Sequence, residues 1–263
     1  MGCATRSTRD CGSEPVAEYA PDTYGNRAAV FYDAWVASRV DNTTEPAAAF
    51  LAELAADGAA LELGIGTGRV ALPLAARGVV VRGIDSSEAM VAQLRLKPGG
   101  ADIPVISGDF ANVAVDGTYQ LIYVVFNTFF ALLSQEDQLR CFRNVAAHLE
   151  PGGRFVIEAF VPDPTLYDRN QRVSTTRVET DRVQLDATQY DPVEQKVTSQ
   201  HILIGKEGIV LLPVQLRFAW PSELDLMAQL AGLKLEARFG GWQGEKFTAA
   251  SASHVSVYGK PTA

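Results

Sequence analysis

Residues 60–87 read "ALELGIGTGRVALPLAARGVVVRGIDSS", and this stretch decides which fold the chain adopts. An apolar run carrying Glu62 leads into three glycines within five positions. A helical pattern follows, and a second apolar run then ends at Asp85. Glycines between a strand and a helix let backbone amides approach a ligand with no Cβ in the way. The stretch therefore predicts a βαβ unit with a ligand at its glycine loop.

The same alternation of strands and helices continues along the chain. Two helical segments, 24–40 and 43–58, precede the loop. Continuous apolar strands separated by helices are typical of an α/β fold whose parallel sheet is covered on both faces. Strands are predicted near 59–63, 79–84, 104–107, 119–126 and 153–160, with helices from Gly68 to Arg77, from Ser87, and from Ser134 to Leu149.

Residues 162–219 follow a different rhythm. Segments 182–190, 193–205 and 209–218 read as successive antiparallel strands, and in the first of them Val183, Leu185 and Ala187 alternate with polar neighbours. A helix follows, with Ser222 as N-cap and Gly232 as its end, and then two strands at 233–239 and 253–259.

Three parts follow from this organisation. We expect a disordered tail at residues 1–20 and a core domain made of 21–161 and 220–263. Residues 162–219 are then an inserted antiparallel cap over the site of the second substrate.

Composition narrows the class of partner. A net charge of -8 repels nucleic-acid phosphates and anionic lipid, which favours a small-molecule partner over nucleic acid or a membrane. Three scattered cysteines are too few for a disulfide framework or a zinc site, and they predict a reducing cytoplasm and no metal. The composition does not distinguish a monomer from a homodimer.

Two ligand classes fit the glycine loop. Residues 66–71, "GTGRVA", match the loose dinucleotide fingerprint G-x-G-x-x-A, with Asp85 beyond it, which leaves a nicotinamide dinucleotide open. The carboxylate of Glu62 would repel a pyrophosphate but attract the ammonium group of S-adenosylmethionine. Glu62 therefore favours S-adenosylmethionine, although it could instead cap the amides of its own loop.

Successive strand ends supply acceptors for one adenosine. Asp85 can accept from both ribose hydroxyls, while Ser86 or Ser87 caps the next helix. Met90 would then lie against the adenine, or else pack in the core. Asp109 in "SGDF" can accept from the adenine amino group, with the neighbouring Phe110 bracketing the base.

Taken together, these motifs resemble the class I S-adenosylmethionine-dependent methyltransferases. Within that class the chain is similar to bacterial small-molecule enzymes, including the N,N-dimethyltransferases of antibiotic amino sugars. The resemblance rests on "LELGIGTGRVALPLA", "GIDSSEAM", "GDF", "LIYVVFNTF", "HLEPGGRFVIEAF" and the C-terminal segment from "WPSELDLMAQLAGL" to "HVSVYGK". It implies a Rossmann-like sheet of seven mostly parallel strands, the last one antiparallel.

The resemblance also implies a set of cofactor contacts. Tyr24 or Tyr32 would close over the cofactor with a hydroxyl in reach of its carboxylate, which Arg27 or Arg69 could also meet. Alternatively, Phe31, Tyr32 and Trp35 seal a helix onto the sheet, which is the role we expect for Trp35. The implied cofactor-binding residues are Tyr24, Tyr32, Glu62, Gly64, Gly66, Gly68, Asp85, Ser86, Met90, Asp109, Phe110 and Phe126.

Few residues are candidates for chemistry, because methyl transfer mainly needs an aimed nucleophile and a water-free site. His201 lies in the inserted segment and is the candidate base, while His148 and His254 fit structural roles. Asn127 could orient the acceptor or form a turn. The sequence "NTFF" there lacks the two prolines found in nucleic-acid amino methyltransferases.

The aromatic residues of the inserted segment and the last loop are a further candidate set. They could form an apolar acceptor pocket or pack the cap onto the core. These residues are Tyr167, Trp220, Trp242 and Phe247.

The sequence thus predicts an S-adenosylmethionine-dependent methyltransferase that modifies N, O or C of a small metabolite, in a tailoring step of secondary metabolism. Two alternatives stay open. The first is an NAD(P)-dependent oxidoreductase, and the second is a protein that binds S-adenosylmethionine without catalysis.

Overall fold

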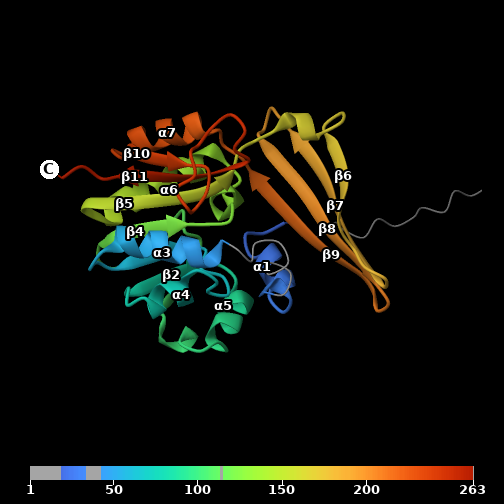
Figure 1. Cartoon of the computed structure of the whole chain (residues 1–263), viewed down its shortest axis with the longest axis horizontal. Coiled ribbons are helices and arrows are strands. Elements are labelled where there is room, and N and C mark those ends of the chain that lie inside the picture. Colours follow the sequence, from blue (N-terminus) through green and yellow to red (C-terminus); the bar gives the residue numbers. More distant parts are fainter. Residues whose placement is uncertain (1–18, 34–42, 113–114, 263) are drawn as a thin grey trace, which may run out of the picture.

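The computed structural model describes residues 19–33, 43–112 and 115–262, which form two sheets (Figure 1). The larger sheet has the strand order β10-β11-β5-β4-β1-β2-β3. The strands from β1 to β5 pair in parallel, and β11 runs antiparallel to β5 and β10. The predicted fold class is confirmed, including the antiparallel last strand. The strands are β1 (Ala60–Leu63), β2 (Val81–Asp85), β3 (Val105–Ser107), β4 (Tyr119–Val124), β5 (Leu149–Phe160), β10 (Lys234–Phe239) and β11 (Ser253–Gly259).

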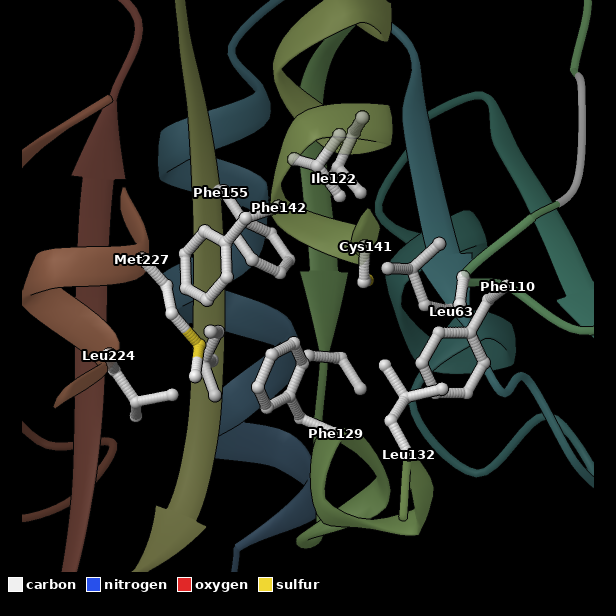
Figure 2. Packing of buried hydrophobic residues seen from close by; sticks show 14 of the residues in the cluster. Leu63, Phe110, Ile122, Phe129, Leu132, Cys141, Phe142, Phe155, Leu224 and Met227 are labelled. Carbon is white, nitrogen blue, oxygen red and sulfur yellow. The ribbon is translucent and has the colours of Figure 1, made fainter. Parts of the chain in front are cut away.

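Helices cover both faces of this sheet. Figure 2 shows one face, where Phe142 of α6 and Met227 of α7 pack against Phe155 of β5. On the other face Leu51 of α3 and Leu74 of α4 belong to a second cluster of buried apolar side chains. Burial of these apolar faces is the main stabilising term. The helices are α1 (Thr23–Ala28), α3 (Thr44–Ala55), α4 (Ala71–Ala76), α5 (Glu88–Arg95), α6 (Gln135–His148) and α7 (Pro221–Leu230), with 3₁₀ turns η1 (Gly100–Asp102), η2 (Thr128–Ala131) and η3 (Pro164–Leu166).

Several helix ends differ from the predicted ones. Ser222 is not the N-cap of α7, because the helix begins at Pro221 with Trp220 as its N-cap. Proline has a fixed φ and no N–H, so it suits the first helical position, and Ser222 becomes the second helical residue, two positions after the N-cap. The predicted end at Gly232 is confirmed, since this residue follows the helix with a φ of 80°. At the other end of the core, α4 begins at Ala71 rather than at Gly68, whose φ of 77° belongs to the loop.

The second sheet is antiparallel and lies between β5 and α7 in the chain. In Figure 1 it stands beside the main domain, with α1 next to β9. Three of its strands match the predicted segments. The fourth, β6, was not predicted, because its side chains are almost all exposed and carry no apolar pattern. The strands are β6 (Gln171–Val178), β7 (Arg182–Asp191), β8 (Lys196–Gly205) and β9 (Gly208–Arg217), in that order.

The inward face of the second sheet is polar in part of β7 and the neighbouring part of β8, whereas Tyr190, Val197 and Leu212 make it apolar elsewhere. Gln184 and Leu212 are 5% and 1% exposed and lie on the inward face. Across the strands, Asp186 pairs with His201, which pairs with Leu212, so all three share this face. On the outward face, Ile209 is 66% exposed. The alternation at residues 183–187 is present, but its polar members face the main domain.

A buried polar network joins the second sheet to the main domain. Arg217 at the end of β9 is 6% exposed, and its guanidinium donates to Gln138 of α6 at 2.6 Å. It also donates to Gln195 at 3.1 Å and to Glu223 of α7 at 2.8 Å. Burial opposes ionisation of Glu223, but hydrogen bonds from Gln195, Arg217 and Gln135 outweigh it and lower its pKa. The network fixes the position of the inward face.

Candidate functional site at the glycine loop

The glycine loop brings bare backbone to the carboxyl edge of the main sheet. Gly64, Gly66 and Gly68 have φ angles of 71°, 54° and 77°, a region that favours glycine. A Cβ on Gly64 would lie 2.4 Å from Cγ2 of Thr128, so the turn after β4 packs directly on the loop. A Cβ on Gly66 would meet none of the described residues within 4 Å. Gly66 is thus the point where a ligand can reach the backbone.

Glu62 is a buried carboxyl beside this loop. It is 2% exposed, and the hydroxyl of Tyr123 donates to its Oε2 at 2.9 Å. Burial raises the pKa of Glu62 to about 8, against the hydrogen bond from Tyr123 and the nearby charge of Arg69. Within the described part of the chain Glu62 forms no ion pair. A cationic ligand group would offset the cost of burying its charge.

Asp85 ties the end of β2 to the glycine loop. Its Oδ2 accepts from the amide of Gly66 at 2.7 Å and its Oδ1 from the amide of Ser87 at 2.8 Å. Burial raises its pKa despite these bonds. Ser87 is the N-cap of α5, its Oγ accepting from the amide of Met90 at 3.3 Å. A serine therefore supplies the cap, as expected, but Asp85 is not left free of backbone bonds, and Ser86 does not cap the helix.

Phe126 and Asn127 form the turn after β4 in a left-handed conformation, with φ angles of 57° and 64°. The guanidinium of Arg69 lies 5.2 Å from the centre of the Phe126 ring, which brings this ring to the glycine loop. Oδ1 of Asn127 accepts from the amide of Phe160 at 2.7 Å. The side-chain oxygen of Asn127 therefore holds the end of β5.

The segment after α1 is anchored to the loop. Asp33 accepts from the hydroxyl of Thr67 at 2.6 Å and forms an ion pair with Lys97 at 2.6 Å. Burial raises the pKa of the adjacent Tyr32 to about 12, with Arg69 opposing and Glu62, Asp33 and Asp85 adding to the rise. The phenol of Tyr32 is thus within electrostatic reach of the site.

The other predicted cofactor-contact residues before the glycine loop differ in their surroundings. Tyr24 lies edge-on to Tyr32 with ring centres 6.3 Å apart, and Phe31 packs in the same cluster. Arg27 is exposed. Trp35 lies outside the described residues, as do residues 1–18 of the predicted tail.

Residues after β2 and β3 complete the edge. Met90 is 4% exposed and packs with Ala28 of α1 and Leu212 of β9. Oδ1 of Asp109 accepts from the amide of Ala111 at 2.8 Å. The ring of Phe110 lies mainly in the core, where Figure 2 shows it beside Leu63 and Leu132.

The histidines lie apart from one another. Nδ1 of His201 is 2.6 Å from Oδ1 of Asp186, and both side chains are largely buried on the inward face. His148 binds the carbonyl of Asn144 at 2.8 Å in the last turn of α6, as predicted. Burial and Arg238 lower the pKa of His254 to about 4, which keeps it neutral in the core.

The four aromatic residues that were candidates for an acceptor pocket pack against different neighbours. Tyr167 stacks on Tyr190 with ring centres 4.7 Å apart. Trp242 packs edge-on to Phe50 on the α3 side, and Phe247 lies by His254. Trp220 is 41% exposed.

Sequence reasoning missed several residues of the site. They are Tyr123, Asp33, Lys97 and Glu158. Each forms a hydrogen bond with a residue of the glycine-loop region or the turn after β4 that lies 30 or more positions away in the sequence, so no local pattern reveals it.

Among the described residues there is no cluster of His, Cys, Asp and Glu that could hold a metal. No helix there is long and apolar enough to span a bilayer.

This chain is similar to known methyltransferases in sequence and in fold. The family described as "Methyltransferase domain" matches residues 60–153. The structure of the CcbJ methyltransferase from Streptomyces caelestis is 39% identical, covers 93% of this chain and 100% of its own, and has a TM-score of 0.87. Cypemycin N-terminal methyltransferase from Streptomyces sp is 29% identical over 75% of this chain and 81% of its own length. S-adenosylmethionine-bound CalS10, an amino pentose methyltransferase from Micromonospora echinaspora, is 22% identical over 87% of this chain and 96% of its own, with a TM-score of 0.67.

Proposed function

This chain belongs to the S-adenosylmethionine-dependent methyltransferases, and we propose that it methylates an amine nitrogen of a small molecule of natural-product type. The support for nitrogen is the relative from Streptomyces sp, whose name describes a methyltransferase of an N terminus. Family membership removes the NAD(P)-dependent oxidoreductase from consideration. A non-catalytic cofactor-binding protein stays as the alternative that activity must exclude.

The buried carboxyl of Glu62 is the observation that carries our placement of the cofactor. When bound, S-adenosylmethionine supplies a methyl carbon activated by a positively charged sulfur. Its methionyl end also carries an ammonium group, and a pyrophosphate has no such cation. Glu62 has no described ionic partner and a raised pKa, which fits a carboxylate that becomes charged when an ammonium reaches it.

Asp85 and Gly66 fit the ribose side of the same ligand. Backbone N–H groups donate to both oxygens of the Asp85 carboxylate, and the carboxylate has further acceptor capacity that a hydroxyl can use. Open space at Gly66 lets the ligand approach the backbone. Met90, Asp109 and Phe110 lie after the neighbouring strands, and we assign the adenine to them.

Tyr24, Tyr32 and Phe126 fit the walls of the site. Tyr32 lies within reach of the charges around Glu62, and Phe126 lies against Arg69. We assign the cofactor carboxylate to Tyr32 and Arg69. In this arrangement the residues bind, orient and exclude water, which is most of what an in-line methyl transfer requires.

The Asp186–His201 pair fits the role of proton acceptor. Asp186 can accept the Nδ1 proton of His201, and Nε2 is then the ring nitrogen that we assign as the proton acceptor. An amine reacts only in its neutral form, so a proton must leave the acceptor nitrogen. Leu212, on the same face, packs with Met90, so the pair lies on the side of the second sheet that faces the cofactor residues. We assign the acceptor to this inward face of residues 162–219.

The test of the proposed function is methyl transfer from labelled cofactor to a panel of amines, phenols and carboxylic acids, with the product atom located by mass spectrometry. Transfer to amines is expected. Transfer to phenols or acids alone would overturn the assignment to nitrogen. Tight binding of S-adenosylhomocysteine with no transfer to any of them would favour the non-catalytic alternative.

A further inference from the structure

Glu158 of β5 connects two loops at the carboxyl edge of the main sheet. Its Oε2 accepts from the amide of Phe126 at 2.9 Å, and its Oε1 accepts from Nε1 of Trp242 at 2.9 Å. Phe126 follows β4, and Trp242 lies in the loop between β10 and β11. One carboxylate thus holds the turn after β4 and the last loop of the chain together.

The turn that Glu158 holds is strained. Phe126 and Asn127 are consecutive non-glycine residues in the left-handed region, a backbone conformation that L side chains rarely adopt. Such a conformation persists only where the surroundings fix it. Three hydrogen bonds from the end of β5 do so here, since Glu158 also accepts at its carbonyl from the amide of Asn127 at 3.3 Å, and Phe160 donates to Asn127.

The strained turn shapes the glycine loop. Thr128 fills the space where a side chain on Gly64 would lie, and the ring of Phe126 faces Arg69. A shift of the turn would therefore move the wall of the site and the groups nearest to Glu62.

We propose that Glu158 is a positioning residue for the cofactor, which it serves by holding the Phe126–Asn127 turn against the glycine loop. Glu158 itself does not touch the cofactor in this role. The inference rests on the placement of the cofactor in the proposed function. It adds Glu158 of β5 to the residues on which cofactor binding depends, although Glu158 is 32 positions away from Phe126 in the sequence.

The test compares Glu158→Gln with a matched control, Asp225→Asn. An amide at 158 has one acceptor oxygen for two N–H donors, so one donor loses its bond. Asp225 is also a partly buried carboxylate with two partners, Arg238 and Tyr258, but it links α7 to β10 and β11. Both changes should lower the melting temperature to a similar degree. Only Glu158→Gln should weaken the binding of S-adenosylhomocysteine, by about fivefold or more, the effect of about one lost hydrogen bond.

The readout is the dissociation constant of S-adenosylhomocysteine by calorimetry, measured beside the melting temperature of each variant. Equal affinity in Glu158→Gln and the wild type, or an equal loss in both variants, would overturn the proposal. If Glu158→Gln does not fold, Glu158→Asp keeps both acceptor oxygens on a shorter stem and gives the same comparison. No methyl acceptor is present in the measurement, so a wrong assignment of the methylated atom would change the transfer assay and leave this result intact.

Discussion

The glycine-loop edge of the main sheet and the inward face of the second sheet both hide polar side chains, but they assemble them differently. At the loop, Glu62 and Asp85 come from one βαβ unit, and backbone amides of that unit hold Asp85. On the second sheet, Asp186 and His201 come from separate strands, and Leu212 of a third strand lies beside them. The first arrangement follows the order of the chain, whereas the second depends on the register between strands.

In the proposed function this difference separates two roles, cofactor binding and proton transfer. The glycine loop offers buried carboxyls and open backbone, which fit the cofactor. The inward face offers a histidine oriented by a carboxylate, which fits proton transfer. Changes at the loop should alter cofactor affinity, and changes on the inward face should alter turnover alone.

The largest expected effect is that of Glu62→Gln on cofactor affinity. Loss of the charge removes a charge-assisted interaction with the ammonium, so the dissociation constant of S-adenosylhomocysteine should rise by about 10- to 100-fold. Calorimetry measures it. An unchanged dissociation constant would contradict our placement of the ammonium group beside Glu62.

The next effect is the pH dependence of stability in the free protein. The pKa of Glu62 in the fold is about 8, above its unfolded value of about 4.5, so the folded state keeps a proton that the unfolded state has lost. Stability should therefore fall as pH rises towards 8. The lowered pKa of His254, about 4 against 6.5, acts in the opposite direction but only below pH 6.5.

The clean window for this measurement is consequently between pH 6.5 and 8. Free energies of unfolding should drop there by roughly 1 kcal/mol per pH unit. The control is Glu62→Gln, which should lose most of this slope. A wild-type slope that is flat, or one that persists in the variant, would assign the proton to another group.

Asp85→Ala should weaken cofactor binding by at least about tenfold, because a bidentate contact to hydroxyls is worth on the order of 1.5 to 3 kcal/mol. The same change frees the amide of Gly66, so the melting temperature must be recorded with the affinity. Unchanged affinity for S-adenosylhomocysteine would place the ribose elsewhere.

His201→Gln and Asp186→Asn test the other side of the comparison. Each should lower kcat by about tenfold, less than the roughly 100-fold or more typical of general base catalysis because part of the acceptor amine is already neutral, and leave the affinity for S-adenosylhomocysteine within twofold. The loss from His201→Gln should shrink at higher pH, where the acceptor amine is already neutral. A loss of cofactor affinity equal to the loss of kcat would show that the two regions are not separate.

The smallest expected effect is that of Ile209→Thr on the outward face. Ile209 is 66% exposed, so the free energy of unfolding should change by less than about 0.5 kcal/mol. Urea denaturation measures it, with the buried Leu212→Ala as control, for which a loss of about 2 kcal/mol or more is expected. A large loss at Ile209 would mean that the outward face is covered by another chain in solution.

Much of the site was predictable because its motifs are local. The strands, the glycine loop, Glu62, Asp85 and the cap at Ser87 all lie within 28 consecutive residues. Burial of Glu62 is visible in its apolar strand, yet its partner Tyr123 is 61 residues away. Asp33, Lys97 and Glu158 escaped notice for the same reason, because nothing in their neighbourhood marks them as partners of the loop.

The sequence by itself determined the parallel sheet and its glycine loop, and it led to our proposal of a cationic ligand group beside Glu62, because strand and helix periods, glycine φ angles and charge are properties of short segments. Only the tertiary structure decided which face of the second sheet turns inward and how Glu158 holds the Phe126 turn. These depend on register and packing between distant segments, where a polar face can be buried if its groups find partners there. Gln184 and Asp186 are the clearest case, since the alternating pattern at residues 183–187 alone would bury the other face.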